Sequence, residues 1–147
     1  MPRVVFLEVP HPPLERTACH AVARLVGQEH RVVVRARDAT QAARLDELLW
    51  TFDPGAFLAH RRVAPGADVD GAPEAALVVP GELDWPAATA LVLAGPLEPA
   101  QVPDRYDVVI DFAIPYDEAL LEASRARFRA WRERGVEPEY KRRGSGA

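Results

Sequence analysis

The alternation of short apolar runs with segments of helical periodicity constrains the fold of this chain more than any other feature. The runs are rich in β-branched and other apolar residues without polar alternation, which is typical of strands buried on both faces of a parallel sheet. The sequence therefore predicts an α/β protein, a three-layer α/β/α fold with a mostly parallel central sheet. The expected strands are residues 3–9, 30–36, 56–63, 75–81, 89–95 and 106–114, and the expected helices are residues 14–26, 38–52 and 116–135.

The length and composition fit one domain. The chain has 147 residues, of which 48% are apolar, and its single cysteine, Cys19, excludes an internal disulfide framework. We expect the domain to span residues 1–137 and residues 138–147 to form a flexible tail, because that segment has no periodicity. No apolar run approaches the ~18–20 residues of a transmembrane helix, and the N-terminal segment lacks the pattern of a signal peptide. We therefore expect a cytoplasmic location.

The turn after the first expected strand argues against a nucleotide site. It reads "EVPHPPLE" (residues 8–15) and contains no glycine. A dinucleotide-binding or P-loop turn needs glycines so that backbone amides can approach a phosphate closely. The sequence therefore predicts that the nucleotide-binding loop common in such folds is absent.

The side chains that most often carry catalysis or bind metals form no familiar constellation. No two of the four histidines have helical i, i+3 or i, i+4 spacing, and Cys19 points about 100° away from its neighbour His20 within one helix. Asp111 and Asp117 flank the end of the last expected strand, but an isolated aspartate there more often caps a helix than transfers protons. We expect no cofactor, no metal and no catalytic residues.

The stretch "SRARFRAWRERG" (Ser124 to Gly135) concentrates positive charge at the end of an acidic chain. The formal net charge is −4, yet residues 121–147 carry eight basic and four acidic residues. Arg125, Phe128, Arg129 and Arg132 follow i, i+3, i+4, i+7 spacing and share one helix face. Guanidinium groups bind carboxylates in bidentate fashion, so this face is suited to an anionic partner. The alternatives are an ordinary solvated face and an inward-packed Phe128.

Three motifs together resemble the chi subunit of bacterial DNA polymerase III holoenzyme. They are "RLDELLW" (residues 44–50), the pair Phe57 and His60, and "VVIDFAIPYDEALLEASRARFRAWRERG" (residues 108–135). The resemblance implies a noncatalytic, Rossmann-like fold without a nucleotide-binding loop. It also implies binding of the acidic, phenylalanine-ended C-terminal tail of single-strand DNA-binding protein. The residues that match this peptide site are Arg125, Phe128, Arg129, Arg132 and, lining its pocket, Ile114.

The resemblance implies a second surface built on Trp50 and Phe57. In the family this surface binds the psi subunit, which connects chi to the clamp loader, and in some bacteria a helicase uses it instead. Large aromatic residues are enriched at the centres of interfaces. The alternative is that Trp50 completes the core face of its helix after Leu45 and Leu49.

Two other functions remain open from the residues alone. One is a direct nucleic-acid-binding domain that uses the arginine-rich helix, although the acidic remainder of the chain argues against extensive phosphate contacts. The other is a small α/β enzyme with a site that no motif identifies.

Overall fold

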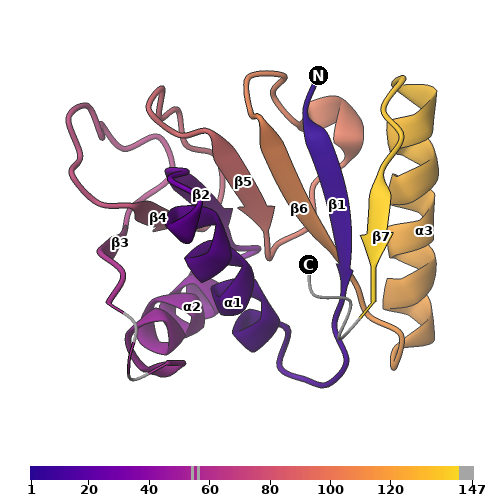
Figure 1. Ribbon diagram of the computed structural model, residues 1–147, viewed down its shortest axis with the longest axis horizontal. Coiled ribbons are helices and arrows are strands. Elements are labelled where there is room, and N and C mark those ends of the chain that lie inside the picture. Colours follow the sequence, from indigo (N-terminus) through magenta and orange to yellow (C-terminus); the bar gives the residue numbers. More distant parts are fainter. Residues whose placement is uncertain (54, 56, 143–147) are drawn as a thin grey trace.

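The computed structural model describes residues 1–53, 55 and 57–142, and it shows a parallel sheet with helices on both faces (Figure 1). Across these residues the sheet has seven strands in the order β3-β4-β2-β5-β6-β1-β7, and every neighbouring pair is parallel. The strands are β1 (Arg3–Glu8), β2 (Val32–Arg35), β3 (His60–Arg62), β4 (Ala76–Val79), β5 (Ala90–Leu93), β6 (Val108–Ala113) and β7 (Glu139–Lys141).

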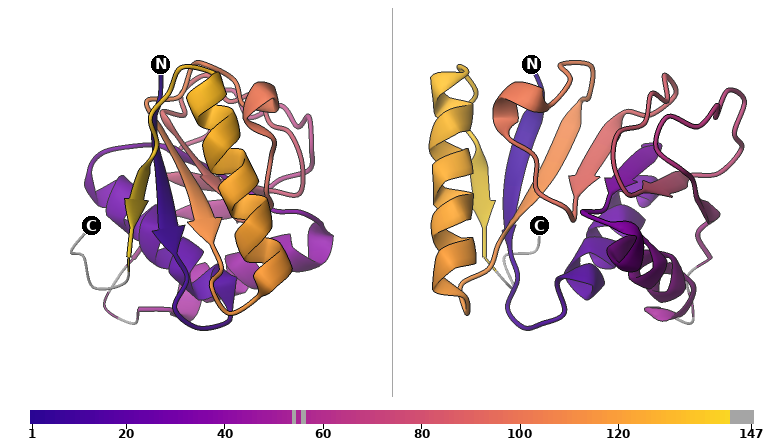
Figure 2. Two further views of the ribbon diagram at one scale, coloured as in Figure 1. Left: turned by 90° about the vertical axis from the view of Figure 1, so that its right-hand side faces the viewer. Right: turned by 180° about the vertical axis from the view of Figure 1, so that it is seen from behind.

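Helices α1 (Leu14–Gly27) and α2 (Ala39–Thr51) pack on one face of the sheet, and α3 (Glu118–Glu133) packs on the other (Figure 2). The predicted three-layer α/β/α class with a parallel sheet is therefore confirmed. Every helix end lies within two residues of the expected one. None of the described helices is both long enough and apolar enough to span a bilayer.

Each face of the sheet has its own apolar core, because successive strand residues point to opposite sides. Val5, Val34 and Ile110 pack toward α1 and α2, whereas Phe6 and Val109 pack toward α3. Two tryptophans, Trp85 and Trp131, are buried on the α3 side. Burial of the sheet on both faces explains why its strands are apolar throughout.

Two aspartates begin helices in the manner that the sequence suggests. The Asp38 side chain accepts a hydrogen bond from the Gln41 amide at the start of α2, and Asp117 accepts one from the Leu120 amide at the start of α3. These bonds satisfy amides that the first helical turn leaves without partners. Asp117 is therefore a helix cap, as the simpler interpretation of its position predicted.

The segment expected to be a flexible tail contributes a strand. Residues 139–141 form β7, which pairs with β1 in register from Val5↔Glu139 to Leu7↔Lys141. An ion pair between Arg3 and Glu139, at 2.6 Å, reinforces this edge. The ordered domain thus extends beyond residue 137, and residues 143–147 of the expected tail lie outside the described residues.

The connections on the α3 side of the sheet differ from those of a regular doubly wound fold. The links from β4 to β5 and from β5 to β6 contain no α-helix, only the short 3-10 helix η1 (Pro99–Gln101). Helix α3 covers β6, and the loops cover the remainder of this face. The space between these two loops is therefore not filled by a helix.

Candidate functional site

The five arginines of α3 and its C-terminal end divide into two groups with different surroundings. Arg127 and Arg134, seven residues apart, face the protein: Arg127 is buried against Asp111, and Arg134 donates to the carbonyl oxygens of Pro99 and Val102. Arg134 also pairs with the Asp104 carboxylate at 2.7 Å. These two arginines attach α3 to β6 and to the loop that contains η1.

Arg125, Arg129 and Arg132 point outward and are exposed, as their shared spacing predicts. Each contacts a nearby carboxylate: Arg125 and Arg129 lie 3.9 and 3.5 Å from Glu122, and Arg132 lies 2.8 Å from Glu137. Exposed ion pairs of this kind are worth only about 0–1 kcal/mol. The three guanidiniums can therefore exchange these partners for the carboxylates of a ligand at little cost.

Phe128 lies between the two groups and takes part in both the core and the surface. Its ring packs against Phe6 of β1, with 5.3 Å between the ring centroids, and it is half-buried. The Arg132 guanidinium lies over the ring, 4.9 Å from its centroid. One edge of Phe128 thus supports the fold, while the ring also lines the surface beside the outward arginines.

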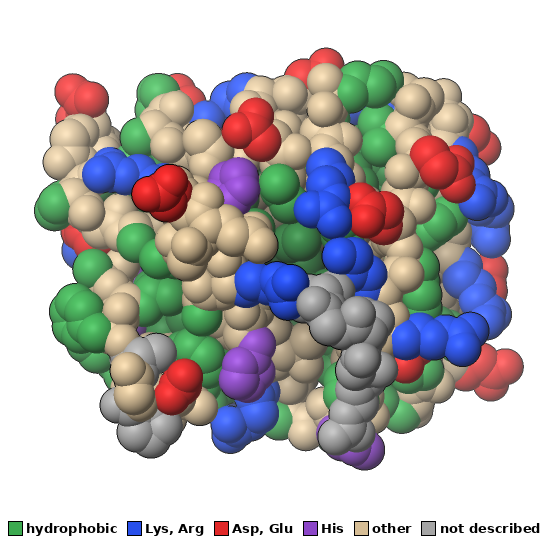
Figure 3. All heavy atoms as spheres, in the orientation of Figure 1, with side chains coloured by type: hydrophobic (Ala, Val, Ile, Leu, Met, Phe, Trp, Pro, Cys, Tyr) green, Lys and Arg blue, Asp and Glu red, His purple; other side chains and the backbone are tan. Residues whose placement is uncertain are grey.

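A groove of about 540 Å³ lies between α3 and β7, and we call it the α3–β7 groove. Apolar and aromatic side chains form part of its lining, and Arg125 and Arg142 contribute positive charge. Basic side chains also gather along this edge of the molecule in the space-filling view (Figure 3). The lining residues are Phe6, Glu8, Pro115, Leu121, Ser124, Arg125, Phe128, Tyr140 and Arg142.

Sequence reasoning missed the contribution of β7 to this groove. Tyr140 pairs in register with Phe6, so it lies beside Phe128 despite its distance along the chain, and Arg142 follows directly. Three extended residues carry no recognisable periodicity. The only available signal was the sequence "EYKRR", an aromatic residue among basic ones.

A hydrogen bond between neighbouring strands, within the lining of the groove, joins Tyr140 of β7 to Glu8 of β1. The Tyr140 hydroxyl donates to Glu8 Oε2 at 2.7 Å. Partial burial, with this bond and the negative charge of Glu8, raises the pKa of Tyr140 to about 12. The tyrosine therefore stays a donor at neutral pH and holds the only carboxylate that lines the groove among the described residues.

The structure brings together some of the predicted peptide-site residues and not others. Arg125 and Phe128 line the groove, and Arg132 reaches it through its contact with Phe128. Arg129 lies one step around the helix and does not line it. Ile114 packs against the core on the α1–α2 side of the sheet, and its neighbour Pro115 lines the groove instead.

Trp50 and Phe57 are both exposed, at 58% and 84%. The Trp50 ring packs on the buried His60, with 4.5 Å between centroids, and His60 is held by the Leu58 carbonyl and the Asp46 carboxylate. The alternative that Trp50 completes the core is therefore wrong, and Leu45 and Leu49 fill that face of α2. Trp50 lies in the last turn of α2, and Phe57 follows it seven residues later.

Asp111 is not placed as a free acid or base. Arg127 donates to both of its carboxylate oxygens, at 2.7 and 3.1 Å, and the Phe112 amide donates to one of them. Burial raises the pKa of Asp111, while the Arg127 guanidinium opposes this shift.

The other candidate groups for catalysis or metal binding are not placed for it either. Burial and the nearby Glu15 raise the pKa of the Cys19 thiol to about 12, so it is no nucleophile at neutral pH. Among the described residues no group of three or more His, Cys, Asp or Glu side chains is arranged to hold a metal ion.

Comparison with known proteins identifies a family whose model matches most of this chain. The family model described as "DNA polymerase III chi subunit, HolC" matches residues 1–139. DNA polymerase III subunit chi of Escherichia coli is 28% identical over 127 residues, covering 83% of this chain and 80% of that protein. The protein of the same name from Haemophilus influenzae is 27% identical over 127 residues, covering 83% and 82%. The family match ends within β7, before Tyr140 and Arg142.

Two solved structures share the fold at low sequence identity. The C-terminal domain of Saccharomyces cerevisiae Dbp5, bound to Gle1 and IP6, aligns with a TM-score of 0.64 at 13% identity, covering 97% of this chain and 90% of that one. Phage T4 UvsW aligns with a TM-score of 0.62 at 9% identity, covering 95% of this chain and 40% of that one. At these identities the likeness concerns the fold alone.

Proposed function

This chain belongs to the DNA polymerase III chi subunit family, and from that premise we propose that it is a noncatalytic accessory subunit of the cytoplasmic replication machinery. Its role in this proposal is to bind the acidic, phenylalanine-ended C-terminal tail of single-strand DNA-binding protein. The α3–β7 groove is the binding site.

The composition of the α3–β7 groove carries this proposal. The aromatic rings of Phe128 and Tyr140 offer an apolar surface to a phenylalanine side chain, while Arg125 and Arg142 can take carboxylates. Arg132, above the Phe128 ring, lies close enough to add a third cation. An apolar surface with guanidiniums on its sides fits a peptide whose last residue is aromatic and whose neighbours are acidic.

Calorimetric titration with a synthetic ten-residue peptide of that type tests the proposal. We expect wild type to bind in a salt-dependent manner, because the contacts are charged and exposed. Charge-assisted hydrogen bonds contribute roughly 1.5–3 kcal/mol when well formed, so Arg125→Glu weakens binding by about tenfold or more. Arg16→Glu is the matched control, since Arg16 is an exposed arginine of α1 that does not line the groove.

Three outcomes would count against the site. Equal affinity of wild type and Arg125→Glu would show that the peptide binds elsewhere. Equal affinity for peptides with and without the terminal phenylalanine would reduce the groove to a nonspecific basic surface. Loss of affinity in the Arg16→Glu control would indicate an effect of net charge alone.

We further propose that Trp50 and Phe57 bind a second protein, a psi-like component of the clamp loader or a helicase. Their exposure supports this, because large aromatics in water are costly unless a partner covers them. A pull-down from the source cells with wild type, Trp50→Ala and Phe57→Ala tests the surface. We expect both variants to lose the second protein and to keep the peptide affinity.

A further inference from the structure

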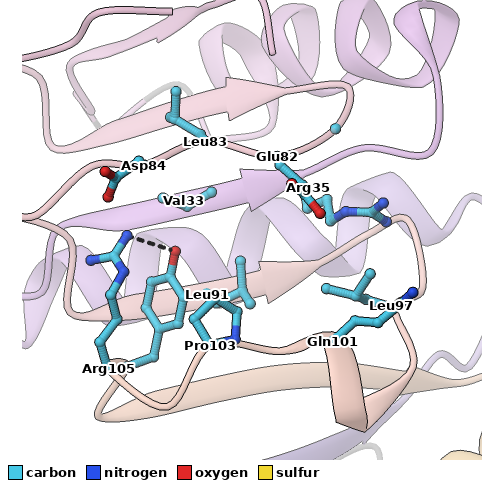
Figure 4. A pocket seen from close by; sticks show the side chains of 12 residues that line it. Val33, Arg35, Glu82, Leu83, Asp84, Leu91, Leu97, Gln101, Pro103 and Arg105 are labelled. Carbon is cyan, nitrogen blue, oxygen red and sulfur yellow. Dashed lines mark hydrogen bonds between the residues drawn. The ribbon is translucent and has the colours of Figure 1, made fainter. Parts of the chain in front are cut away.

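A second groove lies on the α3 side of the sheet, between the two helix-free connections. Val33 of β2 and Leu91 of β5 form its floor, and the loops after β4 and β5 form its walls (Figure 4). Its volume is about 370 Å³, within the range of small-molecule sites. It shares no lining residue with the α3–β7 groove.

The backbone at the end of β2 is fitted closely to the loop after β5. The Gly95 amide donates to the Arg35 carbonyl at 2.7 Å, and a Cβ at Gly95 would lie 2.3 Å from the Arg37 nitrogen. Only glycine permits this approach. This close approach of the two backbone segments brings the carbonyl oxygens of Gly95 and Pro96 within reach of Arg35. Arg35 Nη1 donates a hydrogen bond to each of them, at 3.3 and 3.0 Å.

The Arg35 guanidinium is held in place but not neutralised. Its Nη1 bonds go to neutral carbonyls, and its Nε is buried without a hydrogen-bond partner among the described residues. A buried donor left without an acceptor costs about 1–3 kcal/mol, more when charged. The groove therefore has a fixed cation in its lining, beside apolar side chains, that no carboxylate of the described residues pairs with.

The other charges of the groove limit what can bind there. Glu82 lies toward the same end as Arg35, whereas Asp84 and Arg105 lie at the opposite end (Figure 4). Arg105 is engaged, because it donates to the Trp85 carbonyl and the Tyr106 hydroxyl. Two carboxylates in the lining disfavour a multiply charged anion such as phosphate.

We propose that this groove binds a small monocarboxylate with an apolar body. The carboxylate meets the Arg35 guanidinium, which no carboxylate of the described residues pairs with, and the apolar body lies over Val33, Leu91 and Leu97. This site is separate from the proposed peptide site and does not depend on it.

Titration with hydrocinnamate, followed by backbone amide shifts in nuclear magnetic resonance spectra, tests the proposal on the full chain. We expect saturable changes centred on Val33, Leu91 and Leu97, with a dissociation constant on the order of 1 mM. The neutral amide of hydrocinnamate and inorganic phosphate should each bind at least about tenfold more weakly, since each lacks one half of the required chemistry.

Four variants make the test specific. Arg35→Gln weakens hydrocinnamate binding by about tenfold, and Arg35→Lys, which retains the charge without Nε, gives a smaller loss. Glu82→Gln strengthens binding by removing a like charge. Arg37→Gln, two residues further on and outside the groove, changes nothing.

The proposal is overturned if Arg35→Gln binds hydrocinnamate as tightly as wild type does, or if wild type binds the neutral amide as tightly as hydrocinnamate. It is also overturned if hydrocinnamate shows no saturable binding at all. Shift changes centred on Phe128 would mean that hydrocinnamate occupies the α3–β7 groove instead, which also overturns it. Because Arg125→Glu should leave hydrocinnamate binding at Arg35 intact, failure of this site and failure of the peptide site are distinguishable.

Discussion

Asp111 of β6 and Arg127 of α3 form a buried bidentate ion pair that sets the rotation of α3 on the sheet. The Nε–Oδ2 distance is 2.7 Å and the Nη2–Oδ1 distance is 3.1 Å, and the two residues are 1% and 8% exposed. With Arg127 facing the sheet, the helix must present Arg125, Arg129 and Arg132 to the outside. A structural arginine thereby positions the arginines of the proposed binding site.

Breaking this pair from one side should be far more damaging than replacing both partners. Arg127→Met or Asp111→Leu leaves a buried charge without its partner, and we expect a loss of about 3–5 kcal/mol in the free energy of unfolding. The double variant Asp111→Leu with Arg127→Met should recover most of that loss. Urea denaturation of the four proteins measures the coupling, and simple additivity of the two single losses would contradict this role.

Arg142 should contribute to peptide affinity even though it lies beyond the family match. It lines the α3–β7 groove opposite Arg125. We expect Arg142→Ala to weaken peptide binding by about tenfold and Arg129→Ala, outside the lining, to have a smaller effect. Calorimetric titration measures the peptide affinity of both variants. A larger loss for Arg129→Ala than for Arg142→Ala would mean that the peptide binds on the Arg129 side of α3 and not in the α3–β7 groove.

The Tyr140–Glu8 bond should tune the affinity of the groove for an acidic ligand. Glu8→Gln removes a repulsive charge and is expected to strengthen peptide binding several-fold at low salt. Tyr140→Phe removes the donor that holds the carboxylate, and it should weaken binding. Glu133→Gln, an acid of α3 outside the lining, serves as the control, and equal gains from it and from Glu8→Gln would show a net-charge effect only.

The exposed aromatic side chains of Trp50 and Phe57 should contribute little to stability. Because surface substitutions change the free energy of unfolding by about 0.5 kcal/mol or less, Trp50→Ala and Phe57→Ala should shift Tm by no more than about 2 °C. Trp131→Ala, which empties a fully buried site, should lower Tm by roughly 10 °C. A fall comparable to that of Trp131→Ala would make Trp50 part of the core.

Alkaline pH should destabilise the protein through Cys19. Burial holds the thiol pKa at about 12 in the folded protein, against 9.0 when exposed. The unfolded chain therefore releases this proton first, so the stability present below pH 9 decreases as pH rises toward 12. Urea denaturation of wild type and Cys19→Ala across this range isolates the contribution, and parallel curves for the two proteins would contradict it.

The strands, the helices and the outward face of α3 follow from local chemistry that the sequence displays. Uninterrupted apolar runs predicted the parallel sheet, and i, i+3, i+4, i+7 spacing predicted that Arg125, Phe128 and Arg132 share a face. The same helical geometry places Arg127 and Arg134 on the other side of α3, where they face the protein. These predictions succeed because helical and strand periodicity depend only on neighbours along the chain.

Which surfaces meet was decided by the tertiary structure alone. Tyr140 reaches the proposed site only through the pairing of β7 with β1. Ile114, directly after β6, packs against the core on the α1–α2 side of the sheet. Trp50 is exposed because Leu45 and Leu49 already fill the core face of α2. The position of the Arg35 guanidinium, whose charge no carboxylate of the described residues neutralises, depends on Gly95, sixty residues further along the chain. Such relationships join segments distant in the chain, so no local pattern encodes them, and packing of the sheet and its layers determines them.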